Sequence, residues 1–186
     1  MAIDLGKKGY LYPQAVLVLG TYDEKGVPDA MTAAWGMMGD YGKVCVCLAL
    51  EHRTVANLKK TGALTIAPAT ARTVKEADYL GLVSGNDVPD KVAKAGLHAI
   101  KSDKVNAPIF EEFPLTLECK VLSLDEETGF LLASIENVRA DESILTNGHI
   151  DTDKLEAIAY DPDSHDYLLV KGRVGKAFRD GLALKK

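Results

Sequence analysis

A series of short, apolar and β-branched segments, separated by turns of hairpin length, constrains the fold of this chain more than any other feature. Residues 15–22 (AVLVLGTY) end at the turn sequence Asp23-Glu24-Lys25-Gly26. Residues 115–124 (LTLECKVLSL) alternate between apolar and polar side chains, and a turn at 125–129 separates them from residues 130–140. Segments of this length joined by such turns are typical of neighbouring antiparallel strands. The sequence therefore predicts a mainly β protein.

Other segments extend this pattern and place short helices between the strands. We predict further strands at residues 44–50, 63–68, 157–160 and 167–170, and helices at residues 54–61, 74–82 and 89–95. Residues 97–114 are predicted to be irregular, and residues 141–147 and 174–179 to form helical turns. Antiparallel strands with inserted short helices favour a barrel over a doubly wound sheet. Because no repeat or linker divides the chain, we predict a single domain over residues 1–186.

Composition narrows the class of protein. Of the 186 residues, 47% are hydrophobic and 26% are charged, which is the balance of an ordinary globular domain. The formal net charge of −5 argues against nucleic acid or an anionic membrane as the main partner. The three cysteines form an odd set, and the first residues lack the apolar core of a secretory signal. We therefore expect a cytoplasmic protein.

Common motifs for metal, nucleotide or hydrolytic chemistry are missing from the sequence. The four histidines are widely spaced, so no metal site is predicted. Cys45 and Cys47 share one face of a predicted strand and are interpreted as small buried side chains, with a catalytic thiol or metal ligand as the alternative. Residues 172–176 (GRVGK) have two residues between the glycines, where a phosphate-binding P-loop needs four. We predict no catalytic triad.

Three features remain that could bind an anion or a flat ring. His52, Arg53 and Thr54 precede a predicted helix, whose start offers free N–H groups and a positive dipole end, although a solvated helix cap is the simpler interpretation. Lys91, near Ser84 and Gly85 in sequence, is interpreted by itself as part of a solvated helix face. Trp35 is the only tryptophan, in the run DAMTAAWGMM, and a single large ring is usually part of the core.

Taken in order, these features match a set of family markers. The chain resembles the flavin reductase-like, FMN-binding split-barrel family, especially its flavoredoxin-type branch. The resemblance is carried from about residue 13 to residue 181 by short motifs in fixed order: Gly26-x-x-Asp29-Ala30-Met31-Thr32-Ala33-Ala34-Trp35, Arg53-Thr54-x-x-Asn57, Ala77-Asp78-Tyr79-x-Gly81-x-x-Ser84-Gly85, Asp90-Lys91, Asn106-Ala107-Pro108-Ile109 and Val174-Gly175-Lys176-Ala177-Phe178.

The resemblance implies an antiparallel split β-barrel that forms a homodimer with one FMN per subunit near the dimer interface. In this family the segment around the tryptophan lies along the flavin and the arginine turn holds the phosphate. The cofactor-binding residues carried over in this way are Asp29, Met31, Thr32, Ala33, Ala34, Trp35, His52, Arg53, Thr54, Asn57, Ser84, Gly85, Lys91 and Tyr160.

Asp29 departs from the family pattern, which commonly has asparagine at this position. An ionised aspartate cannot donate a hydrogen bond. If Asp29 contacts a flavin carbonyl or phosphate, it must therefore be protonated, and otherwise it must turn away. The substitution could also shift flavin affinity or potential.

The resemblance implies that FMN carries the redox chemistry, which explains why no catalytic side chains are expected. One hypothesis is an oxidoreductase that takes a hydride from NAD(P)H and passes electrons to an acceptor. A second is a flavoredoxin-type electron carrier, reduced by a redox protein and without its own nicotinamide site. An inactive binding barrel and an oxidase of pyridoxine phosphate are more remote alternatives.

Overall fold

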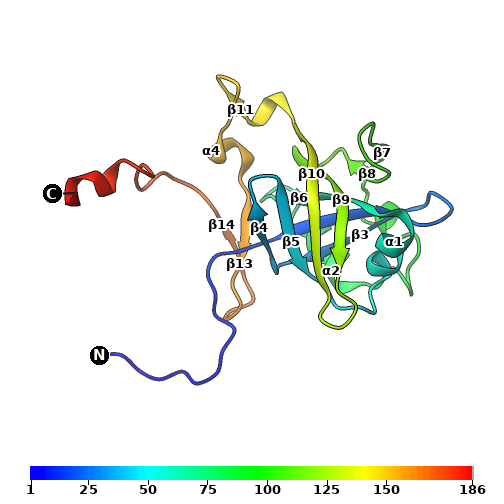
Figure 1. The fold of residues 1–186 in the computed structure, drawn as a ribbon, viewed down its shortest axis with the longest axis horizontal. Coiled ribbons are helices and arrows are strands. Elements are labelled where there is room, and N and C mark those ends of the chain that lie inside the picture. Colours follow the sequence, from blue (N-terminus) through cyan, green and yellow to red (C-terminus); the bar gives the residue numbers. More distant parts are fainter. Residues whose placement is uncertain (186) are drawn as a thin grey trace.

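A seven-stranded antiparallel sheet forms the body of the protein, in a computed structural model that describes residues 1–185 (Figure 1). The strand order is β3-β2-β6-β9-β10-β5-β4. In chain order the strands are β2 (Leu17–Tyr22), β3 (Pro28–Ala33), β4 (Gly36–Asp40), β5 (Lys43–Cys47), β6 (Ala63–Pro68), β9 (Leu115–Leu124) and β10 (Phe130–Ala140). Every pair in this sheet is antiparallel, so the predicted fold class is confirmed.

The two edges of this sheet are joined by a very short connection. β3 and β4 lie at opposite edges of the strand order, yet only Ala34 and Trp35 separate them in sequence. The sheet must therefore curl until its edges approach each other. The amide of Cys47 also donates to the carbonyl of Trp35 at 2.9 Å, which ties this connection to the β5 side. The run DAMTAAWGMM thus forms the seam of a half-barrel.

Smaller elements surround the curled sheet. The helices are α1 (Arg53–Thr61), α2 (Val74–Leu82), α3 (Lys91–Lys94) and α4 (Thr152–Leu155), with 3-10 turns at Glu142–Ile144 and Asp180–Leu184. Three minor sheets pair β1 (Gln14–Ala15), β13 (Ile158–Tyr160) and β14 (Tyr167–Leu169); β7 (Ala99–Lys101) and β8 (Pro108–Phe110); and β11 (Leu145–Thr146) and β12 (His149–Ile150).

Strands β2 and β3 are buried on both faces, which explains the nearly continuous apolar sequence of β2. Leu19 and Met31 point into a cluster inside the curled sheet, where Leu58 of α1 also packs. Val18 and Ala30, one residue earlier on each strand, point into a second cluster under α2 and α3. Because side chains alternate along a strand, these two cores place α1 against one face and α2 with α3 against the other.

Most predicted elements are found at or near their predicted bounds. The ends of β6, α2, β9 and β10 coincide with the predicted residues. The prediction of irregular structure over residues 97–114 was wrong for β7 and β8, which form a short hairpin there. Pro108 is the first residue of β8, a position where proline does not prevent strand pairing. The helical turn predicted at residues 174–179 is found at the end of that range, where the amides of Arg179 and Asp180 donate to the carbonyl of Lys176, and a 3-10 turn follows at Asp180–Leu184.

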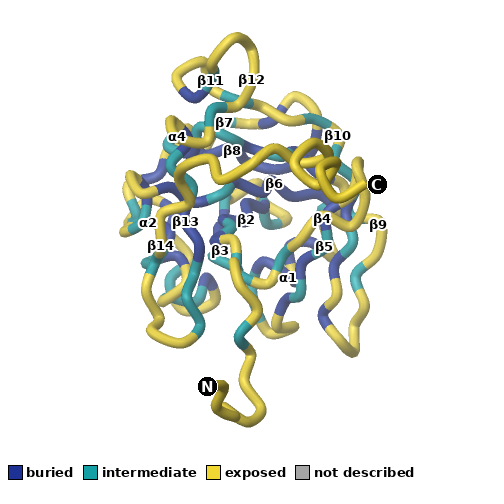
Figure 2. The backbone as a smooth tube through the Cα atoms, turned by 90° about the vertical axis from the view of Figure 1, so that its left-hand side faces the viewer, coloured by how far each residue is buried: buried dark blue, intermediate teal, exposed yellow. Residues whose placement is uncertain are grey.

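Both ends of the chain extend away from the body of the domain in Figure 1, and Figure 2 shows both ends coloured mainly as exposed. Nearly all of residues 1–13 and all of residues 171–185 are exposed, including apolar side chains such as Leu11, Val174 and Phe178. No helix in the described part of the chain is both long and apolar enough to cross a membrane.

Candidate functional site

A cavity of about 210 Å³ lies between the middle of β3, the start of α1 and the loop that joins α2 to α3. Segments far apart in the sequence meet here because β3 packs against both helix layers. The lining residues are Asp29, Met31, Thr32, His52, Arg53, Thr54, Leu80, Gly81, Leu82, Val83, Ser84, Gly85 and Lys91.

The start of α1 faces this cavity and has no side-chain cap. His52 is the N-cap residue with extended backbone angles, φ −66° and ψ 140°, and its side chain accepts no capping hydrogen bond. The first N–H groups of a helix have no partner within the helix and carry partial positive charge. At the other end Gly62 adopts the left-handed conformation, φ 66°, and Lys59 and Lys60 complement the negative end of the dipole. The start of α1 is therefore free to bind an anion.

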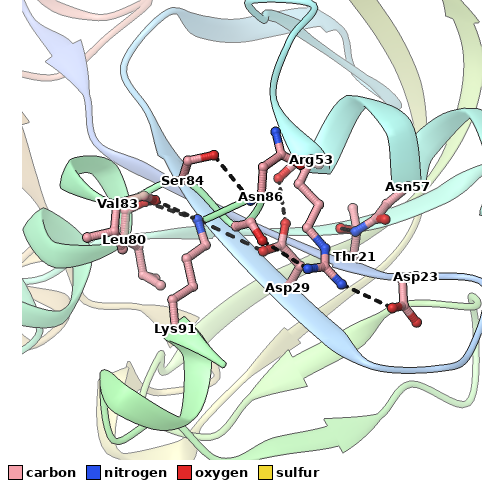
Figure 3. A network of polar contacts seen from close by, with 12 residues as sticks. Thr21, Asp23, Asp29, Arg53, Asn57, Leu80, Val83, Ser84, Asn86 and Lys91 are labelled. Carbon is pink, nitrogen blue, oxygen red and sulfur yellow. Dashed lines mark hydrogen bonds and ion pairs between the residues drawn. The ribbon is translucent and has the colours of Figure 1, made fainter. Parts of the chain in front are cut away.

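Arg53, the first residue of α1, ties together two loops at the cavity (Figure 3). Its Nη1 donates to the carbonyl oxygen of Gly85 at 2.9 Å, and its Nη2 donates to Asp23 Oδ2 at 3.1 Å. Backbone hydrogen bonds from Val27 and Lys25, together with the Arg53 guanidinium, hold the pKa of Asp23 below its usual value. Arg53 is thus a fixed positive charge rather than a freely moving surface side chain.

Asp29 and Lys91 form a buried charge pair at the base of the cavity (Figure 3). Lys91 is only 3% exposed, and its Nζ lies 3.9 Å from Asp29 Oδ1. Burial raises the pKa of Asp29, opposed by the charge of Lys91 and a hydrogen bond from Thr54. Burial likewise lowers the pKa of Lys91, opposed by the charge of Asp29. The interpretation of Lys91 as part of a solvated helix face was therefore wrong, whereas Lys94 is exposed.

Gly85 is required by close packing at this point. A Cβ atom built at position 85 would overlap Asp29 Oδ1 and would lie 3.0 Å from Arg53 Cδ. Both neighbours are held in place, Asp29 by burial and Arg53 by its two hydrogen bonds. The absence of a side chain at this position therefore lets the α2–α3 loop approach β3 and α1.

A second cavity of about 350 Å³ adjoins the first, and the two share Thr32, Gly81 and Leu82. Ala34 and Tyr160 line it, together with Tyr167. The hydroxyl of Tyr167 donates to Asp78 at 2.8 Å, and burial with this hydrogen bond raises the pKa of Tyr167 to about 12. The two cavities together form one depression, with charged groups at one end and aromatic rings at the other.

The structure brings most of the predicted site residues to this depression and places three elsewhere. Nine of them line the first cavity: Asp29, Met31, Thr32, His52, Arg53, Thr54, Ser84, Gly85 and Lys91. Asn57 lies on the buried side of α1 and donates to Thr21 at 3.0 Å, and Ala33 packs against the inner core. Trp35 is 67% exposed and lines a shallow hollow with residues of the N-terminal segment. The core interpretation of Trp35 was therefore wrong for the described chain.

Sequence reasoning missed several groups at the site. Asp23 was assigned only to a hairpin turn, and nothing local indicates that it pairs with Arg53, 30 residues away. The carbonyls of Leu80 and Val83, which accept from Lys91, carry no side-chain signal. Gly81 and Asp78 do lie within the motif Ala77-Asp78-Tyr79-x-Gly81, and that motif is the signal that could have found them.

A curled antiparallel half-barrel with an uncapped helix start beside its edge strand β3 defines the class of split-barrel proteins. Residues 9–168 match the model of the flavin reductase like domain, and the chain belongs to this family. The family prediction is thereby confirmed.

Solved structures agree with this assignment. A flavoredoxin of Desulfovibrio vulgaris (Miyazaki F) is 33% identical, with a TM-score of 0.93 over 97% of this chain and 100% of that chain. An FMN-binding domain of a flavin reductases-like enzyme from Shewanella baltica is 17% identical, with a TM-score of 0.80 over 88% of this chain and 89% of that chain, and it shows the fold alone. An uncharacterized protein of Aeropyrum pernix is 27% identical, and the matched part covers 62% of this chain but only 44% of that longer protein.

Proposed function

We propose that this protein is an FMN-binding flavoprotein oxidoreductase whose cofactor lies along β3. The observation that carries the proposal is the pair of joined cavities, which have a positive helix start at one end and Tyr160 with Tyr167 at the other. FMN has the same polarity, with an anionic phosphate at one end and a flat aromatic ring at the other. The match of residues 9–168 to the flavin reductase like domain supports this choice.

The residues present fit the phosphate of FMN. The uncapped start of α1 offers backbone N–H donors beside Arg53 and Thr54, and helix starts are common phosphate sites. Ser84 and Lys91 line the same cavity from the opposite side, with His52 at its rim. Asn57 would act from behind, because its bond to Thr21 holds α1 against β2.

The ring would lie along the end of β3. This strand is at the sheet edge, so part of its backbone donors have no strand partner and can reach a flat ligand. Met31, Thr32, Ala33 and Ala34 would supply this surface, since small side chains allow close approach. Thr32 Oγ1 donates to the Ala77 carbonyl at 2.5 Å and so fixes the spacing between β3 and α2. When bound, FMN supplies the redox chemistry, and the chain binds, orients and shields it.

We further propose NAD(P)H as the electron donor, with free flavin, an iron chelate or a redox protein as the acceptor. The second candidate function is an electron carrier without its own nicotinamide site, and the 33% identity to a flavoredoxin over the whole of that chain favours it. An absorbance spectrum of the purified protein with added FMN tests cofactor binding. Absence of any flavin absorbance and of any binding would overturn the proposal.

Stopped-flow mixing of the FMN-loaded protein with NADH and NADPH without oxygen separates the two functions. Rapid loss of the yellow colour supports an oxidoreductase. Reduction by a partner redox protein alone supports the carrier. Free FMN mixed with the same donors is the control for reduction that does not need the protein.

A homodimer is also proposed, because the seam of the half-barrel exposes apolar side chains. Met37 and Met38 on the edge strand β4 are exposed beside Trp35 and Tyr41. Several exposed apolar side chains along one sheet edge favour an interaction site. In a dimer, Trp35 could cover a flavin at the subunit interface. Sedimentation analysis checks whether the protein is a dimer in solution.

The single-domain organisation and the cytoplasmic location stay predictions from the sequence.

A further inference from the structure

One buried oxygen at the candidate site lacks a hydrogen-bond donor. Asp29 is 2% exposed, and Thr54 Oγ1 donates to its Oδ2 at 3.0 Å. Its Oδ1 has no donor among residues 1–185, although Asp29 lines the cavity beside Gly85. Buried polar atoms are nearly always paired, so an exception calls for a partner outside the chain.

The neighbouring cations do not supply this missing donor. Lys91 Nζ donates to the carbonyls of Val83 at 3.1 Å and Leu80 at 3.4 Å, and its 3.9 Å distance from Asp29 Oδ1 is too long for a hydrogen bond. Arg53 directs its terminal nitrogens to Gly85 and Asp23 instead. Lys91 of α3 therefore attracts the Asp29 carboxylate without satisfying its oxygen.

The charges around the cavity nearly cancel before any ligand binds. The charged groups that face Asp29 are Arg53 on α1 and Lys91 on α3; Asp23 lies beyond Arg53, and His52 lines the same cavity. Two carboxylates thus offset the two fixed cations. A phosphate monoester brings close to two further negative charges at neutral pH. Its oxygens are acceptors, and so is the unpaired oxygen of an ionised Asp29.

We propose that Asp29 takes up one proton from solvent when the cavity binds the phosphate group of FMN, and that its protonated carboxyl then donates a hydrogen bond to a phosphate oxygen. The inference rests on the proposed function and deepens it. The proton removes one negative charge from the crowded site and converts an acceptor without a donor into a donor. Burial already holds the pKa of Asp29 above its usual value, which favours this uptake.

Calorimetric titration of the full chain with FMN counts the proton directly. The titration is run at about pH 8, where the phosphate, with its second pKa of about 6, is already fully ionised. The heat is compared in Tris and HEPES buffers, whose ionisation enthalpies differ. We expect uptake approaching one proton per FMN bound. Between about pH 7 and pH 9 the FMN affinity should fall by up to about tenfold per pH unit.

Two variants isolate the group responsible. Asp29→Asn keeps the shape of the side chain and donates without titrating, so proton uptake and the pH dependence should disappear. Asp23→Asn is the matched control: it also removes one carboxylate near Arg53, but the low pKa of Asp23 keeps that group ionised throughout this pH range. Uptake should therefore persist in Asp23→Asn. A thermal melt of each variant checks its fold, and the wild-type proton count does not depend on either variant.

The outcomes separate this inference from the proposed function. No binding of FMN overturns both together. Binding by the wild type without proton uptake, or uptake that persists in Asp29→Asn, overturns the inference alone. The same uptake with riboflavin, which lacks the phosphate, overturns the assignment of the hydrogen bond to a phosphate oxygen.

Discussion

Replacing Arg53 with alanine tests the placement of the phosphate. The guanidinium is 19% exposed and is held at the cavity by Gly85 at 2.9 Å and Asp23 at 3.1 Å. A hydrogen bond from a charged donor to an ionised acceptor contributes about 1.5–3 kcal/mol. Because 1.36 kcal/mol is a factor of ten, the FMN dissociation constant should rise about 10- to 150-fold. Riboflavin affinity should stay unchanged, since riboflavin brings no phosphate to Arg53.

Quenching of flavin fluorescence on titration with protein measures both affinities. Arg53→Lys is the matched variant, because it keeps the charge but cannot form the forked pair of hydrogen bonds. We expect its FMN affinity to lie between those of the wild type and Arg53→Ala. Unchanged FMN affinity in Arg53→Ala would refute the placement of the phosphate. An equal loss for FMN and riboflavin would refute it as well, since the effect would then arise from a change in the whole cavity.

Three further predictions concern other residues of the proposed cofactor site. Gly85→Ala should lower the free energy of unfolding by about 1–3 kcal/mol and weaken FMN binding, because its Cβ would overlap Asp29 and crowd Arg53. A thermal melt and the same titration check it, and wild-type stability and affinity would contradict it. Trp35 is the only tryptophan, and its fluorescence should be strongly quenched when FMN binds. Unchanged emission would mean that the flavin does not lie near Trp35. Asp29→Asn should change the pH dependence of stability without ligand. The folded-state pKa of Asp29 is raised, so protonation of Asp29 stabilises the folded state. This stabilisation is fully present below the unfolded-state pKa of about 3.9 and is lost as pH rises through the folded-state value. The melting temperature of Asp29→Asn should therefore rise relative to that of the wild type as pH rises through this range. A difference that does not change with pH would contradict a raised pKa for Asp29.

Local patterns in the sequence were sufficient for most of the secondary structure. Strands β9 and β10 alternate around a five-residue turn, and α1 ends at Gly62 with lysines in its last turn. Such signals depend on side-chain period, turn chemistry and capping, all of which act within a few residues. The hairpin β7–β8 was missed because its strands are only three residues long and carry no clear period.

The candidate site was likewise predicted only where local sequence motifs specify it. Order and spacing of short motifs identified the family and nine of the thirteen residues that line the first cavity, including Arg53 and Gly85. Contacts between distant segments decided the rest. The pairing of Arg53 with Asp23 and the support of Thr21 by Asn57 join residues 30 and 36 positions apart. No local pattern specifies such pairs.

Burial was the property that the amino-acid order did not reveal. Lys91 and Trp35 are the clearest cases: a lysine interpreted as solvated is buried against Asp29, and a tryptophan interpreted as core is exposed at the seam of the half-barrel. Exposure depends on which distant segments pack over a residue, and that is set only when the curled sheet brings β3, α1 and α3 together. The sequence determined the strands, turns and family motifs, because these depend on neighbouring residues. The tertiary structure decided the charge balance of the cavity and left one oxygen of Asp29 without a donor.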